Sequence, residues 1–131
     1  MPRKHPAPDD PRTWLARARS DWKLATAAIP GVLLEDLCYH AQQCAEKALK
    51  ARLLAMGREF PRTHDLALLV SRLEAAGEVV PKGVQAAVGL TEYAVEGRYP
   101  GFSEAVTERQ RRRAAALAGR VLLWVETRLR R

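Results

Sequence analysis

Apolar residues recur at intervals of three and four along most of the chain, which is the pattern of helices with one buried face. The first such face is formed by Trp14, Leu15, Ala18, Trp22 and Ala25. Asp10 and Pro11 provide an N-cap and a first-turn proline before it, and Pro30-Gly31 breaks the pattern. We therefore expect a helix over 11–29.

Four more segments follow with the same periodicity, and we expect helices over 33–56, 66–76, 82–95 and 104–129. Thr63 or Asp65 is the expected cap of the third helix, and Ser103 that of the last. The apolar stripe of the last helix consists of Leu117, Val121, Trp124 and Val125. No segment shows strand alternation with hairpin signals, so the fold class is predicted to be all-α, an up-and-down bundle of four to five antiparallel helices. Residues 1–9 are expected to form a flexible tail and 10–131 a single helical domain.

A polar stripe borders the apolar face of the second helix. The face itself is rich in small residues: Leu37, Ala41, Cys44, Ala45, Ala48 and Ala55. Asp36, His40, Gln43 and Lys47 fall within a sector of about 60° at its edge. Lysine can hold a phosphate, glutamine can read a base edge, and histidine can move a proton. Two interpretations remain open: a ligand-binding face, or residues that pair locally along the helix.

The charge balance favours an anionic partner. There are 22 Lys+Arg against 15 Asp+Glu, a formal net charge of +7, which attracts phosphates, nucleic acid or an acidic protein. The densest basic run is 108–116, in which Arg109, Arg112 and Arg113 lie near one face and Arg111 lies off it. Such a run either contacts a phosphate backbone or forms a solvated helix face.

Several classes of protein are not supported by the sequence. Cys38 and Cys44 lie six apart on one predicted helix, a poor geometry for a disulfide, and no zinc-binding spacing occurs. We expect no metal and no cofactor. No apolar run reaches the length of a membrane span. The basic N-terminus is not followed by the apolar run of a signal peptide, so we expect a cytoplasmic protein without membrane contact.

Three motifs occur in a specific order: "YHAQQCAEKALKA" over 39–51, "REFPRTHDL" over 58–66 and "GRYPG" over 97–101. Together they resemble the HEPN family, the higher-eukaryote and prokaryote nucleotide-binding domains, and most of all its small stand-alone prokaryotic members. The similarity runs from about residue 15 to residue 123. The resemblance implies a helical bundle that forms a homodimer and works with a minimal nucleotidyltransferase in a two-component module of toxin–antitoxin type. Nucleotide or RNA is the implied ligand. The matching positions are His40, Gln43, Lys47, His64, Asp65, Arg98, Tyr99 and Pro100.

The sequence departs from the ribonuclease members of that superfamily. Those members carry an Arg-x4–6-His motif late in the bundle, whereas no histidine follows His64 here. A formal match exists earlier, because Arg58 and His64 are separated by five residues. We therefore predict a non-catalytic or weakly catalytic binding module. The alternatives are a metal-independent endoribonuclease using Arg58 and His64, and a pure protein-interaction scaffold.

Two local features also have a structural interpretation. His64 and Asp65 form an acid/base pair in one interpretation. In the other, His64 bonds to a neighbouring helix while Asp65 or Thr63 caps the third helix. Arg98 and Tyr99 either hold a phosphate and stack on a base, or close the end of the bundle. In the binding interpretation His40, Lys47, His64 and Arg98 carry the site.

Overall fold

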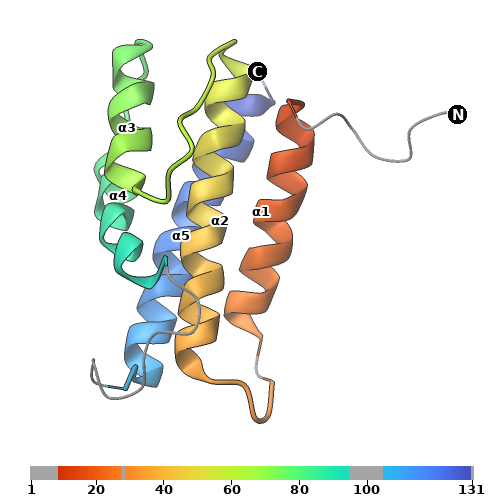
Figure 1. The fold of residues 1–131 in the computed structure, drawn as a ribbon, viewed down its shortest axis with the longest axis vertical. Helices are drawn as coiled ribbons and strands as arrows, with labels where there is room; N and C mark the ends of the chain where they lie inside the picture. Colours follow the sequence, from red (N-terminus) through yellow and green to blue (C-terminus); the bar gives the residue numbers. More distant parts are fainter. Residues whose placement is uncertain (1–8, 28, 95–104, 131) are drawn as a thin grey trace, which may run out of the picture.

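The computed structural model describes residues 9–27, 29–94 and 105–130. The helices are α1 (Pro11–Thr26), α2 (Leu34–Ala55), α3 (Leu66–Ala75), α4 (Lys82–Gln85), the 3-10 helix η1 (Ala86–Tyr93) and α5 (Glu108–Leu129). No strand occurs within these residues, so the all-α prediction is confirmed. Helix α2 lies at the centre, with α1 on one side, α3 and α4 on the other, and α5 behind (Figure 1).

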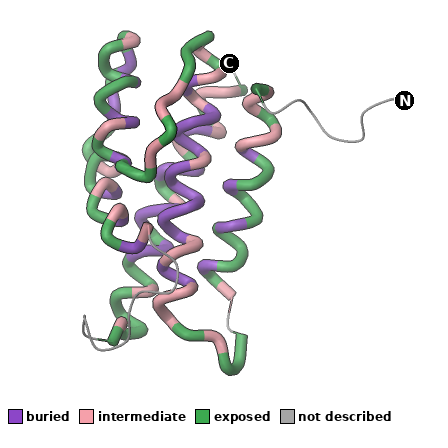
Figure 2. Tube along the Cα trace, in the orientation of Figure 1, coloured by how far each residue is buried: buried purple, intermediate pink, exposed green. Residues whose placement is uncertain are grey.

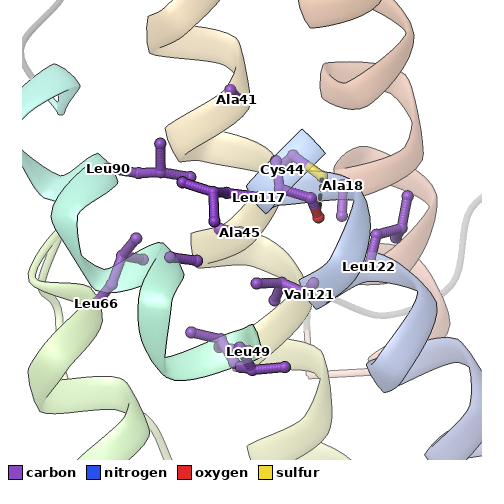
Figure 3. Packing of buried hydrophobic residues seen from close by; sticks show 14 of the residues in the cluster. Ala18, Ala41, Cys44, Ala45, Leu49, Leu66, Leu90, Leu117, Val121 and Leu122 are labelled. Atoms are coloured by element: carbon purple, nitrogen blue, oxygen red, sulfur yellow. Dashed lines mark hydrogen bonds between the residues drawn. The ribbon is translucent and has the colours of Figure 1, made fainter. Parts of the chain in front are cut away.

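Small side chains on α2 allow its neighbours to approach closely. Ala41, Cys44, Ala45 and Ala48 are at most 1% exposed, and they form one core with residues of α1, α3, η1 and α5 (Figure 3). The buried positions of α2 extend along most of its length (Figure 2). Ala55, predicted for the same face, is exposed because it is the last residue of the helix and nothing packs over it. Both cysteines are buried thiols that form no disulfide.

The chain returns along α2 before α3 begins. Loop 57–65 runs back beside α2, so α3 starts part-way along that helix (Figure 1). Gly57 ends α2 with a φ of 73°, in the left-handed region that only glycine adopts easily. This return places the loop beside the second half of α2, and its Phe60 meets Trp14 at the start of α1.

Three of the predicted helices differ from the observed ones by more than one residue at an end or in the type of helix. Helix α1 ends at Thr26 rather than at residue 29. The predicted helix 82–95 is one α-helical turn followed by a 3-10 helix, in keeping with the weak helix propensity of Gly83 and Gly89. Helix α5 begins at Glu108 and not at 104, because Thr107 and Gln110 form a capping box. Ser103 itself lies outside the described residues.

Helices α1 and α5 are connected by hydrogen bonds from a side chain of each helix to a backbone carbonyl of the other. Trp22 Nε1 donates to the Ala115 carbonyl at 3.1 Å, and Arg111 Nη1 donates to the Ala25 carbonyl at 3.1 Å. Arg111 is thus turned away from the exposed Arg109, Arg112 and Arg113, as the sequence pattern predicts.

Among the described helices, none is both long and apolar enough to cross a membrane.

Candidate functional site

A buried carboxylate of α1 binds two residues of the predicted stripe on α2. Asp21, which is 7% exposed, accepts a hydrogen bond from His40 Nδ1 at 2.9 Å and one from Lys47 Nζ at 2.6 Å. His40 and Lys47 therefore connect α2 to α1 rather than pairing with each other along α2. The sequence analysis did not single out Asp21, since no local spacing connects it to the second helix.

The other two members of the stripe lie elsewhere. Asp36 is in the first turn of α2, and its side chain forms no hydrogen bond or ion pair with any described residue. Gln43 is buried, and its amide donates to Gln42 Oε1 at 2.7 Å. The four residues thus do not converge on one point in this structure.

A second polar cluster centres on Glu46, which is only 3% exposed. Its carboxylate accepts hydrogen bonds from Lys50 Nζ at 2.9 Å, His64 Nδ1 at 2.8 Å and Gln42 Nε2 at 3.2 Å. Burial acts to raise the pKa of Glu46, but the hydrogen bonds from Lys50 and His64 outweigh it and hold that pKa below its usual range. The Glu46–Lys50 pair is an i,i+4 pair and was readable from the sequence.

The same cluster anchors loop 57–65 to α2. Gln42 Nε2 donates to the backbone carbonyl of His64 at 3.0 Å, in addition to the bond from the His64 ring to Glu46. Asp65 Oδ1 accepts from Ala67 N at 3.0 Å, so Asp65 caps α3 and forms no acid/base pair with His64. The His64 side chain is 65% exposed, which leaves its second ring nitrogen, Nε2, open to a ligand.

A pocket of about 670 Å³ lies between the start of α1, the second half of α2 and loop 57–65. Its lining residues are Asp9, Trp14, Lys50, Leu54, Glu59, Phe60, Arg62, Thr63 and His64. The rings of Trp14 and Phe60 meet edge to face, with centroids 5.0 Å apart and planes at 80°. Lys50 Nζ lies 5.6 Å from the Trp14 ring and 5.0 Å from the Phe60 ring. The pocket therefore combines aromatic walls with a charged rim.

Other candidate residues are outside this pocket. Arg58 is exposed in the same loop, but it does not line the pocket and forms no hydrogen bond with His64. Arg98 and Tyr99 lie outside the described part of the chain. Within that part, no three His, Cys, Asp or Glu side chains are arranged to hold a metal ion. Trp14 is predicted from the sequence only as part of the apolar face of its helix, and Phe60 and Arg62 do not stand out there, because only the folded chain brings the three together.

Comparisons with known proteins agree with the motifs. The sequence profile of the HEPN domain family matches residues 11–128. A crystal structure of a protein from Thermus thermophilus is 30% identical, with a TM-score of 0.77 over 89% of this chain and 96% of that one. The crystal structure of an archaeal HEPN homologue is 28% identical, with a TM-score of 0.72 over 92% of this chain and 98% of that one. No protein of curated function matches significantly. The chain belongs to the HEPN domain family.

Proposed function

We propose that this HEPN protein binds a phosphate-bearing nucleotide or nucleic acid and acts with a minimal nucleotidyltransferase in a two-component system of toxin–antitoxin type. Membership of the family supports a role related to nucleotides or nucleic acids in general. The observation that carries the more specific proposal is the aromatic pocket with Arg62 and His64 at its rim. Aromatic rings suit bases, and guanidinium and imidazolium groups suit phosphates.

The expected site residues differ in how free they are to meet a ligand. The His64 side chain is largely exposed and borders the pocket, so it is the best placed of them. His40 and Lys47 are partly exposed, but both already bind Asp21, whose carboxylate offsets part of the positive charge of Lys47. We propose that Lys47 attracts the phosphate, that His40 can hydrogen-bond to the ligand, and that Arg98 adds a further phosphate contact.

The proposed assembly is a homodimer. HEPN family members often dimerise. Several large apolar side chains are exposed on this chain, including Leu123 at 61% and Val79 at 85%, and would be available to a partner. Light scattering coupled to size-exclusion chromatography measures the mass in solution, and a monomer at high protein concentration would contradict this part of the proposal.

Calorimetric titration with ATP, GTP and a short single-stranded RNA tests the binding function. We expect saturable binding to at least one of them, weakened by His64→Ala and by Lys47→Ala. Arg72→Ala is the matched control, since Arg72 is an exposed arginine on α3 that does not line the pocket and lies outside the basic run of α5. If the wild-type chain binds none of the three, the binding proposal is wrong.

A second function has one specific observation in its favour. His64 Nδ1 binds a buried carboxylate and the His64 side chain is largely exposed, an arrangement also found for histidines that act as general bases. A metal-independent endoribonuclease using Arg58 and His64 would cleave RNA in the presence of EDTA, and His64→Ala would abolish the cleavage. Gel analysis of the titrated RNA separates this function from binding alone. Tight binding to the nucleotidyltransferase without any nucleotide binding would instead favour a scaffold.

A further inference from the structure

We infer that the pocket between Trp14, Phe60 and Arg62 binds one nucleotide unit that carries a single phosphate, with its base against the aromatic pair and its phosphate at Arg62 and His64. This inference rests on the proposed function and specifies where and what the chain binds. Of the positions that match the family, only His64 lines this pocket, although Phe60 and Arg62 lie within the same motif.

The walls of the pocket suit a flat ring. Because the Trp14 and Phe60 rings stand at 80°, a base that stacks on one ring meets the edge of the other. Leu54 of α2 adds an aliphatic surface. A volume of about 670 Å³ lies within the range of pockets that hold small ligands and exceeds that of a single base. The remaining space is available for ribose and phosphate.

The aromatic pair is held in place before any ligand arrives. Lys50 lies against both rings and is itself fixed by Glu46, while loop 57–65, which carries Phe60, is tied to α2 through His64 and Gln42. A preformed site loses less side-chain and loop entropy when a ligand binds. The charge of Lys50 is already balanced by Glu46, so Lys50 is not counted as a cation for the ligand.

The charges at the rim limit how many phosphates the ligand carries. Apart from the neutralised Lys50, the lining has one permanent cation, Arg62, together with His64 and the two carboxylates of Asp9 and Glu59. Arg62 can bind a phosphate through two parallel hydrogen bonds, and a carboxylate can accept from ribose hydroxyls. A triphosphate would bring several negative charges close to Asp9 and Glu59, with Arg62 as the one permanent cation of the lining to balance them. The pocket therefore fits a monophosphate better than a triphosphate.

Thr63 adds a hydrogen-bond donor at the same rim. Its Oγ1 accepts from Asp65 N at 3.0 Å, so its hydroxyl proton stays free to donate. The rim thus offers a guanidinium, an imidazole and a hydroxyl to the oxygens of one phosphate.

Titration of the full chain with AMP, ADP, ATP, adenosine and a short single-stranded RNA tests the inference, without magnesium and at constant ionic strength. We expect AMP to bind at least tenfold more tightly than ATP. Phe60→Leu should weaken AMP about tenfold by removing the stacking surface, and Arg62→Gln by a similar factor through the phosphate. Arg62→Gln should leave the weaker binding of adenosine unchanged, and Arg72→Gln, at an exposed arginine of α3 outside the pocket, should change nothing.

The outcomes separate the two proposals. If ATP binds more tightly than AMP, or if Phe60→Leu and Arg62→Gln leave AMP affinity at the wild-type value, this inference is wrong and the site lies elsewhere, while the binding function stands. If no nucleotide and no RNA binds the wild-type chain, the proposed function is wrong as well. RNA affinity that falls in parallel with AMP affinity in both variants would support the inference and identify the ligand as one nucleotide of a strand.

Discussion

Replacing Glu46 with glutamine should destabilise the protein strongly, although the two side chains have nearly the same shape. In Glu46→Gln the Lys50 ammonium, in a residue only 6% exposed, keeps its charge and loses its partner. Breaking a buried ion pair from one side costs about 3–5 kcal/mol. The Trp14 and Phe60 rings beside Lys50 and the remaining amide oxygen offset part of that loss. We therefore expect a decrease of about 3 kcal/mol in the free energy of unfolding.

Urea denaturation at pH 7, monitored by circular dichroism, measures this decrease in the free energy of unfolding. It corresponds to a fall of about 10 °C in Tm for a chain of this length. Glu126→Gln is the matched control. Glu126 also accepts from a cation, Arg19, but the Arg19 side chain is 49% exposed, so the loss should be below about 1 kcal/mol. If Glu46→Gln costs no more than Glu126→Gln, the cluster around Glu46 does not stabilise the fold.

Three further predictions follow from other buried groups. Burial acts to raise the pKa of Glu78, but hydrogen bonds from Arg128 and Arg52 outweigh it. The folded pKa values of Glu78 and of Glu46 therefore both lie below the unfolded value of about 4.3. Their stabilisation is present above that pH and lost below it, so the urea midpoint should fall between pH 5 and pH 3; a constant midpoint would contradict this. Asp21→Asn should lower the free energy of unfolding by about 2 kcal/mol, because Asp21 accepts charge-assisted bonds from His40 and Lys47; an unchanged urea midpoint would argue against it. Burial raises the pKa of the Cys44 thiol, so Cys44 should resist a thiol-specific reagent until the protein is unfolded, whereas rapid labelling of the native protein, located by mass spectrometry, would contradict its burial.

Helical periodicity was enough to predict the class of the fold because each long helix buries a continuous face. Helix α2 shows this best, since its small residues repeat at the spacing that faces α1 and α5. The 3-10 helix over Ala86–Tyr93 was predicted as part of an α-helix, because periodicity over a short segment with glycines does not separate the two. The start of α5 was readable from Thr107 and Gln110, whose spacing is that of a capping box.

The candidate site was less predictable, because its groups come from distant parts of the sequence. Trp14 and Phe60 are 46 positions apart, and they meet only because loop 57–65 turns back along α2. Asp21 and Lys47 are 26 positions apart and lie on different helices. Local patterns identified His40, Lys47 and His64 as unusual, but their partners depend on how α1, α2 and the loop pack together.

Helix α2 therefore has two kinds of polar edge. Toward α1 its His40 and Lys47 bind Asp21, and toward loop 57–65 its Glu46 binds Lys50 and His64, which line the pocket. This division suggests that substitutions at Lys47 and Glu46 act partly through stability. Binding data on such variants should be compared at temperatures well below their respective Tm values.

The most direct test of nucleotide binding at this pocket is a nuclear magnetic resonance titration of the isotopically labelled chain with AMP and with a short single-stranded RNA. We predict saturable shifts of the amides in loop 57–65 and of the indole N–H of Trp14, while the indole N–H of Trp22, which binds the Ala115 carbonyl, stays in place. Saturable shifts confined to other parts of the chain would contradict the site. A spectrum unchanged by either ligand at millimolar concentration would contradict the claim that this protein binds nucleotides.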